Sequence, residues 1–290
     1  MRFIEAMALP FAYPFMVRGL IAAVIVGAVC SVIGCYVVLR GMAFLGSAVA
    51  HSILPGLAIG FLVEGQDDRR SLFWWALGTS VLVALGVGAI SRRGRVREDS
   101  AIGIVFAGMF ALGIALISTV RGFAVDLVHF LFGNVLAVTD WDLTVIAIFG
   151  GGILLLVVLF YKEFLVISFD ETLGRTQRLP VRFYQNLLLV LMAVTVAVSL
   201  QTVGVGLMLA MLVTPPAAAL LVTRRLPVMM VVSAGIGALS GIIGLYVSFY
   251  AGIASGAAIV LVAMGFFLVL LGVSSMRPRR RRSPTEAGTG

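Results

Sequence analysis

Long apolar runs separated by short polar segments dominate the hydrophobicity pattern of this chain. Nine runs approach the length of about 20 residues that an α-helix needs to cross the hydrocarbon core of a bilayer. They cover residues 17–39, 43–62, 73–91, 100–118, 142–162, 184–202, 204–222, 228–250 and 255–275. The pattern therefore predicts an all-α integral membrane protein, a polytopic helical bundle of about eight or nine transmembrane helices.

Two shorter segments do not match a spanning helix. Residues 124–138 hold Asp126 and His129, which favours an external or re-entrant helix, because irregular backbone at membrane depth must be buried in protein or line a cavity. Residues 1–16 carry aromatic side chains suited to the membrane boundary and are predicted to form an interfacial lead-in helix. No cleaved signal peptide is expected.

Composition supports this class and excludes several functions. The 290 residues are 61% hydrophobic and 12% charged, whereas soluble domains average roughly 45–50% apolar and about 25% charged residues. The net charge of +8 lies in short segments between apolar runs, so we expect no nucleic-acid binding. The only lysine, Lys162, lies outside any phosphate-binding motif, and no His-Glu-x-x-His sequence occurs. The chain is therefore not expected to hydrolyse ATP or to be an intramembrane metalloprotease.

The charges between the runs predict the orientation of the chain. One side carries most of the basic residues: Arg40, Arg92, Arg93, Arg95, Arg97, Lys162, Arg175, Arg178, Arg182, Arg224, Arg225, Arg277 and Arg279–Arg282. The other side carries most of the acidic ones: Glu64, Asp67, Asp68, Asp126, Asp140 and Asp142. Basic loops face the cytoplasm, so the first group is predicted to be cytoplasmic. The basic tail 277–290 is then cytoplasmic and expected to be disordered, with its arginines near anionic lipid headgroups.

A histidine lies midway along the second apolar run. Ser47 precedes His51 by four residues and Pro55 follows it by four, so all three share one helix face. Pro55 has no N–H and is predicted to kink the helix and to leave the His51 carbonyl without its usual donor. A neutral imidazole beside a free carbonyl and a hydroxyl could bind a cation. The alternative is a hydrogen-bonded packing histidine at a kink.

His129 is the only other histidine, and Asp126 lies three residues before it. On a helix the two side chains would share a face, where they could provide further cation ligands or where the carboxylate could orient the imidazole. A structural hydrogen bond at the outer surface is the alternative.

A second interruption is expected at Thr214-Pro215-Pro216. Two adjacent prolines remove two helix donors and would free the carbonyls near Met211 and Leu212. Paired interruptions in two spans are typical of transporters, which use them for binding sites and hinges. The pair therefore favours transport over a purely structural membrane protein.

The longest loop on the basic side runs from 169 to 181. Asp170 can cap a short helix there, and Leu173 and Leu179 bracket its polar residues. Such a segment could dock into a groove of a cytoplasmic partner, and a solvated loop is the alternative.

These features together resemble the permease subunit of ATP-binding-cassette transporters for manganese, zinc, iron and related metal ions. The resemblance covers nearly the whole chain, and its specificity comes from the order and spacing of several stretches. They are PFMVR at 14–18, AVAHSILPG at 48–56, AIGIVF at 101–106, DLVHFLFGN at 126–134, the loop at 169–180, QTVGV at 201–205 and LVTP at 212–215.

The resemblance implies a permease like those of type II importers, with residues 1–276 as the transmembrane domain and the spans between 16 and 275. It implies two permease copies per transporter, two cytoplasmic ATP-binding subunits and an external metal-binding protein. The loop at 169–181 would be the coupling helix, with contacts from Asp170, Glu171, Leu173, Gly174, Arg175, Leu179 and Pro180. The cargo would be a divalent ion, Zn²⁺ or Mn²⁺, bound transiently near His51, with no permanent cofactor.

One position departs from the family pattern. The family usually has an aspartate four residues before the histidine, and this chain has Ser47. Loss of the carboxylate removes a hard anionic ligand of the kind that suits Mn²⁺. A metal chelate or another small solute is therefore an alternative cargo, and a secondary transporter without an ATPase is the less favoured alternative mechanism.

Overall fold

The structure is a computed structural model that describes residues 13–64, 69–93, 97–119 and 135–276. Within these ranges nine helices are long and apolar enough to cross a membrane, with the pair α3–α4 counted as one. They are α2 (Pro14–Leu39), α3 (Phe44–Ser52) with α4 (Leu54–Glu64), α5 (Arg69–Arg93), α6 (Glu98–Ser118), α8 (Asp140–Leu159), α11 (Val181–Val203), α12 (Val205–Val222), α13 (Leu226–Ala251) and α14 (Ser255–Met276). The predicted polytopic all-α fold is confirmed, and each helix end lies within about one turn of its predicted position.

Three short elements connect the spans: η2 (Val135–Ala137), α9 (Tyr161–Phe169) and α10 (Glu171–Thr176). The predicted external or re-entrant segment at 124–138 lies outside the described residues except for its last four. Most of the predicted lead-in helix at 1–16 also lies outside them. Its last residues correct the prediction, because Pro14 begins the spanning helix α2, where the fixed φ of proline suits the first turn.

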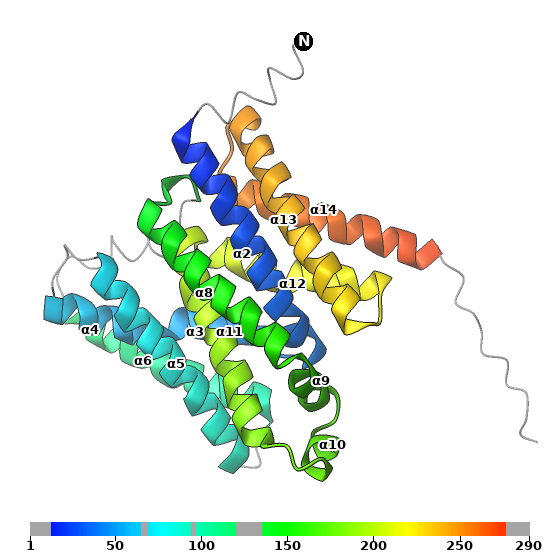
Figure 1. Ribbon diagram of the computed structural model, residues 1–290. Coiled ribbons are helices and arrows are strands. Elements are labelled where there is room, and N and C mark those ends of the chain that lie inside the picture. The colour runs from blue at the N-terminus through cyan, green and yellow to red at the C-terminus, as the bar shows by residue number, and fades with distance from the viewer. Residues whose placement is uncertain (1–12, 65–68, 94–96, 120–134, 277–290) are drawn as a thin grey trace, which may run out of the picture.

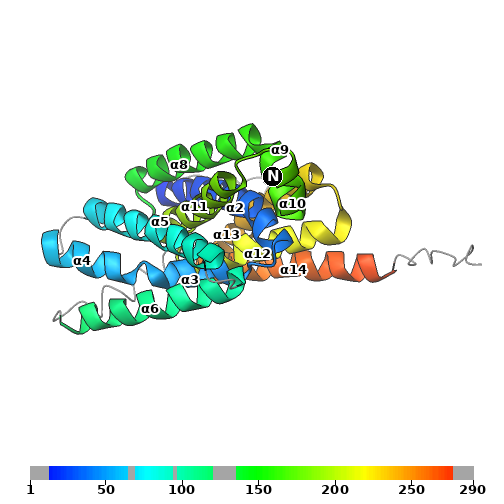
Figure 2. The ribbon, with the colours of Figure 1, turned by 90° about the horizontal axis from the view of Figure 1, so that it is seen from below.

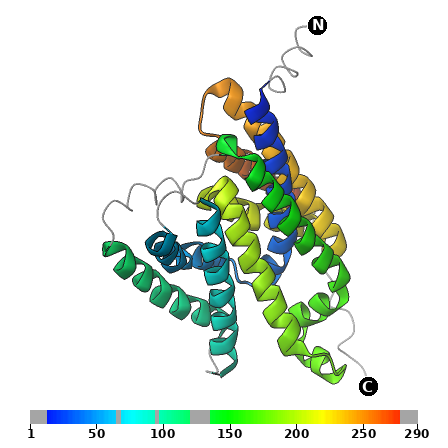
Figure 3. The ribbon, with the colours of Figure 1, turned by 60° about the vertical axis from the view of Figure 1, so that its left-hand side comes forward.

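The spans form two groups that meet along α11. In one group α2 packs against α12 and α13, and α14 packs against both of these. In the other group α3, α4, α5 and α6 pack against one another. Helix α11 contacts α5 and α3 on one side and α2 and α8 on the other, and it lies between the two groups in Figure 1 and Figure 3.

Helices α6 and α14 lie at the edge of the bundle, as Figure 2 shows. Exposed aliphatic side chains such as Leu112 and Ile114 on α6 and Leu261 and Leu268 on α14 cover much of their surface. An apolar helix with so little protein cover is stable in lipid, where exposed aliphatic surface carries no hydration cost.

Glycines bring α2 and α13 into backbone contact. A Cβ atom at Gly27 would lie 2.7 Å from the carbonyl oxygen of Gly237, and a Cβ at Gly241 would lie 3.1 Å from that of Ala23. Helices in lipid associate through such close packing, because no hydrophobic effect drives them together. The small residues around Gly237 and Gly241 therefore form the face of α13 that packs on α2.

The predicted interruption at Pro215 and Pro216 is wrong, because α12 continues through both prolines. The physical reason is the close contact with α2, which lies against the carbonyls that the prolines leave without backbone donors. Ser31 Oγ donates to the Met211 carbonyl oxygen over 3.4 Å. Gly34 lets α2 approach the Leu212 carbonyl so closely that there is no room for a Cβ. The freed carbonyls are therefore part of a helix interface and do not form an open site.

Arginines from separate segments gather at one end of the bundle. Arg40 follows α2, Arg97 precedes α6, Arg175 lies on α10 and Arg182 begins α11, and all four line one cavity. The opposite end holds acidic residues, among them Asp140, which forms an ion pair with Arg18. The predicted division of basic and acidic loops between two sides is therefore found among the described residues.

Candidate functional site

The second span is broken beside the histidine. Helix α3 ends at Ser52 and α4 begins at Leu54, one residue before Pro55. The predicted interruption is present as a one-residue break at Ile53. The predicted loss of the usual donor to the His51 carbonyl also stands, because Pro55 has no N–H. The backbone N–H of Ile53 only points toward that carbonyl across two residues, in a geometry too bent to replace the lost hydrogen bond.

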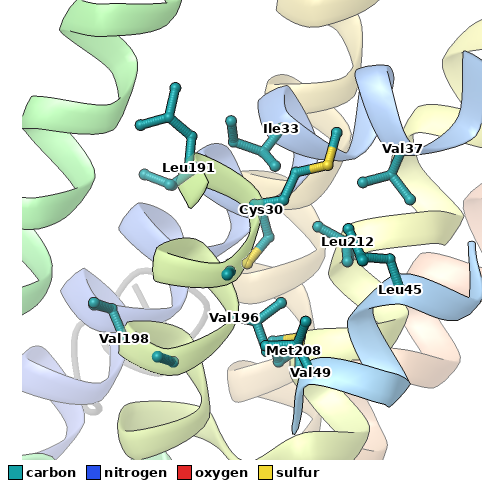
Figure 4. Close-up of a cluster of buried hydrophobic side chains, with 14 of the residues drawn as sticks. Cys30, Ile33, Val37, Leu45, Val49, Leu191, Val196, Val198, Met208 and Leu212 are labelled. Atoms are coloured by element: carbon teal, nitrogen blue, oxygen red, sulfur yellow. The ribbon is translucent and has the colours of Figure 1, made fainter. Parts of the chain in front are cut away.

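The core fixes which face of α3 carries the histidine. Leu45 and Val49 lie in the buried cluster with Met208 and Leu212 of α12, as Figure 4 shows. Successive residues on a helix are about 100° apart, so His51 lies on the side of α3 opposite this pair. The buried pair holds α3 against α12 and directs His51 away from the core.

The imidazole of His51 has one nitrogen engaged and one available. Nδ1 lies 2.8 Å from the carbonyl oxygen of Ser47, and because a carbonyl can only accept, Nδ1 must carry the hydrogen. In the neutral ring Nε2 then holds the lone pair and can bind a cation or accept a hydrogen bond. The predicted proximity of Ser47 and His51 on one face is thus seen as a direct backbone contact.

Two aromatic rings of α6 face the imidazole. The ring centroids of Phe106 and Phe110 lie 6.2 and 6.1 Å from that of His51, both in edge-to-face geometry. The two phenylalanines stack on each other at 5.5 Å. The histidine is therefore half-buried between α3 and α6, and its surroundings from α6 are apolar.

Within the part of the chain that the structure describes, no cluster of carboxylate, cysteine or further histidine ligands is gathered around His51. Over the described part of the chain no three His, Cys, Asp or Glu residues lie close enough to hold a metal ion together. Asp126 and His129, the other predicted ligands, lie outside the described residues. His51 is thus the one predicted ligand whose surroundings can be examined, and its role as a ligand remains a prediction.

At the acidic end of the bundle, the structure buries a carboxylate that the sequence predicted only as a charge between apolar runs. Asp142 is only 3% exposed; its Oδ2 accepts from the Thr139 hydroxyl at 2.7 Å, and its Oδ1 accepts from Gln201 Nε2 at 3.1 Å. The Thr-x-x-Asp spacing is a capping-box signal that could have revealed the first contact. Gln201 comes from α11, and no local pattern indicates it.

The predicted coupling segment contains the short helix expected there. Asp170 caps α10, accepting from the backbone N–H groups of Thr172 and Leu173 at 2.8 and 3.1 Å. Gly174 is buried, and a Cβ on it would lie 3.1 Å from a methyl group of Val181. The backbone N–H of Leu179 donates to the Gly174 carbonyl at 3.1 Å and closes the following turn. The segment is therefore a defined structure seated against α11, not a loose loop.

The coupling segment presents apolar side chains at the surface. Leu173 is 46% exposed, and Phe169 just before α10 and Phe183 in the first turn of α11 are also exposed. Arg175 is exposed, and Pro180 is exposed at the start of α11. The arrangement can contact a partner through both apolar and basic groups, but docking by these residues is a prediction that the single chain does not test.

Nine helices of membrane-spanning length among the described residues, a histidine at a helix break and a capped helix between spans are the features of a polytopic transport permease. The chain belongs to the ABC 3 transport family, whose sequence profile matches residues 12–274. The family predicted from the sequence motifs is thereby confirmed.

Individual relatives agree with this assignment. The chain is 46% identical to "Manganese transport system membrane protein MntC" of Halalkalibacterium halodurans, over 88% of this chain and 86% of that protein. It is 37% identical to "Chelated iron transport system membrane protein YfeD" of Yersinia pestis, over 94% and 90%. The solved structure "PsaBC from Streptococcus pneumoniae in complex with Fab" matches with a TM-score of 0.78 and 38% identity, over 93% of this chain and 95% of that one. The chain is therefore a membrane-spanning permease of the ABC type.

Proposed function

We propose that this permease imports a divalent metal ion, with Mn²⁺ as the first candidate cargo. The name of the relative that is 46% identical supports manganese, and the observation that carries the proposal within the chain is the geometry of His51. Its Nδ1 is held by the Ser47 carbonyl, which leaves Nε2 as a pre-oriented nitrogen ligand. Zn²⁺ remains a candidate because a neutral imidazole suits both ions.

The site near His51 would bind the ion briefly. One imidazole beside two phenylalanine rings provides fewer ligands than a stable site requires, and Ser47 supplies a hydroxyl where the family pattern has a carboxylate. A transport site must release its ion, so modest affinity is expected. Asp126, His129 or the His51 of a second permease copy would supply the remaining ligands in a homodimer.

A metal chelate is the second candidate cargo. The name of the YfeD relative refers to chelated iron, and the replacement of an aspartate by Ser47 both removes a charge and creates space. Uptake of free and chelated metal compared in the same cells distinguishes the two cargoes.

The site is tested with His51→Asn. The side-chain amide of asparagine can reproduce the Nδ1–H donation to Ser47 but has no atom in the place of Nε2. If Nε2 is a ligand, metal uptake falls at least tenfold while the permease is still made and folded. If His51 only packs at the kink, His51→Asn transports normally, and the assignment of the site is wrong. Ser52→Ala is the matched control, because the buried hydroxyl of its neighbour Ser52 has no hydrogen-bond partner among the described residues.

Cytoplasmic ATP-binding subunits would drive the transport cycle. The exposed side chains around Leu173 on α10 support docking there, and the arginine-rich end of the bundle supports a cytoplasmic position for this helix and for the C-terminus in a bacterial cell membrane. An external metal-binding protein would deliver the ion to the opposite end. The proposal is supported if an ATPase co-purifies with the permease and no longer does so when residues 169–180 are altered. Metal uptake without any ATPase would instead identify a secondary transporter.

A further inference from the structure

A polar cavity of about 460 Å³ lies at the arginine-rich end of the bundle. Its polar lining comes from five elements or their ends, α2, α5, α6, α10 and α11, and includes Arg40, Arg97, Glu98, Arg175, Arg182 and Gln185. None of the transport steps proposed above uses this cavity. It lies at the opposite end of α11 from the Asp142–Gln201 contact, because Arg182 and Gln185 begin that helix and Gln201 ends it.

The charges that line the cavity are strongly unbalanced. The lining includes four arginines and one glutamate, and arginine remains protonated at all relevant pH values. Glu98 pairs with Arg40, so one carboxylate is already engaged by one guanidinium. Like charges held together at a partly buried surface repel, and an anion in the cavity would relieve this repulsion.

The most buried of the four arginines has an unused donor. The Arg40 side chain is only 7% exposed. Its Nη2 donates to Glu98, while its Nη1 is buried with no hydrogen-bond partner among the described residues. A buried donor without an acceptor is costly, and this one belongs to a residue that lines the cavity.

We propose that the cavity binds a phosphate-bearing anion. The planar guanidinium fork matches phosphate oxygens in bidentate geometry, and the cavity is several times larger than a single bound water requires. The phosphate would come either from the headgroup of an anionic lipid or from a free phosphate ion. Chloride has no pair of oxygen atoms to accept hydrogen bonds from the two donors of a guanidinium group, so it would bind in the cavity less tightly.

The anion would connect the coupling segment to the bundle. Arg175 lies on α10, whereas Arg40 and Arg97 belong to the ends of α2 and α6. An anion that contacts both sets would hold α10 against the bundle through charge. The binding site does not depend on the proposed metal cargo, so a failed metal assay and a failed anion assay are separate results.

The test uses the purified full-length permease, stripped of lipid in detergent. Phosphatidylglycerol binding is measured by native mass spectrometry, and orthophosphate binding by thermal shift against chloride at equal ionic strength. Arg97→Gln and Arg182→Gln each remove one guanidinium, and both residues are exposed, so that the variants should fold. Arg224→Gln is the control, because Arg224 is an exposed basic residue that does not line the cavity.

We expect each cavity variant to weaken anion binding about tenfold, the effect of losing one charge-assisted contact, and the control to bind normally. Lipid binding that orthophosphate does not displace identifies the headgroup as the source, and displacement identifies free phosphate. The lysine variants Arg97→Lys and Arg182→Lys keep the charge but lose the fork, so they should show an intermediate loss. Unchanged binding in both glutamine variants, or an equal loss in Arg224→Gln, overturns the proposal.

Discussion

The hydroxyl of Ser31 on α2 donates to the carbonyl of Met211 on α12, the carbonyl that Pro215 four residues later leaves without a backbone donor. The next freed carbonyl, that of Leu212, lies directly against Gly34. Ser31 thus replaces one of the two donors that the prolines remove, and Gly34 allows α2 to pack directly on the second carbonyl. The continuity of α12 at the two prolines therefore depends on its contact with α2.

Gly34→Ala should destabilise the permease. The new Cβ would overlap the Leu212 carbonyl oxygen and the ring of Pro216, so α2 and α12 must separate, at a cost of about 1–3 kcal/mol for an overpacked interface. Thermal unfolding in detergent measures the loss. Gly235→Ala is the control, because a Cβ there meets no atom within 4 Å and alanine improves helix propensity by roughly 0.5–1 kcal/mol. Equal melting temperatures for the two variants would contradict the close contact.

Asp142→Ala should also destabilise the protein, through lost hydrogen bonds. The Gln201 amide and the Thr139 hydroxyl both donate to this buried carboxylate, and hydrogen bonds to charged groups contribute about 1.5–3 kcal/mol. Asp140→Ala is the comparison. Its ion pair with Arg18 is exposed, with the aspartate side chain 77% accessible, and such pairs contribute only about 0–1 kcal/mol. A larger effect at Asp140 than at Asp142 would mean that the buried contact is not structural.

Asp170→Ala should impair coupling without unfolding the bundle. The substitution removes the side chain that caps α10, a loss of about 1 kcal/mol confined to a short surface helix. Transport-linked ATP hydrolysis in reconstituted vesicles should fall, while the melting temperature of the bundle changes little. Asp170→Ser retains a capping oxygen and should retain most activity. If alanine and serine behave alike, the cap does not matter for coupling.

Leu173→Asp should abolish binding of the ATP-binding subunits. Leu173 is exposed on the isolated chain, so an aspartate there leaves the fold intact but places a charge in an apolar contact. Pull-down of a co-expressed ATPase measures the effect. Thr172→Asp adds the same charge at the neighbouring exposed position and keeps the leucine. Loss of binding in both variants would indicate sensitivity to charge, not an apolar contact at Leu173.

The spans were predictable because the signal for a membrane helix lies within each segment. A run of about 20 apolar residues forms a spanning helix whatever its neighbours are, and the break at Pro55 follows from its missing N–H. The continuity of α12 was not predictable. It depends on Ser31 and Gly34, nearly two hundred positions away in the sequence, and nothing local to Pro215 indicates them.

The candidate site was predictable to a similar extent. The four-residue spacing of Ser47 and His51 gave their shared face, and the contact between Nδ1 and the Ser47 carbonyl agrees with it. The phenylalanines that flank His51 and the glutamine that binds Asp142 come from other helices, so only packing brings them near. The arginines were interpreted as orientation signals, and their convergence on one cavity required the three-dimensional arrangement.

The backbone contact between Gly27 and Gly237 has a mechanical consequence. Because no side chain separates α2 from α13 at this point, neither helix can roll or tilt without forcing main-chain atoms together, and interfaces this dense resist deformation. We therefore expect α2 and α13 to move as one rigid unit during transport. A conformational change that opens the permease first to one side of the membrane and then to the other would then have to occur at other helix contacts and breaks. The break between Ser52 and Leu54 is the one nearest to His51.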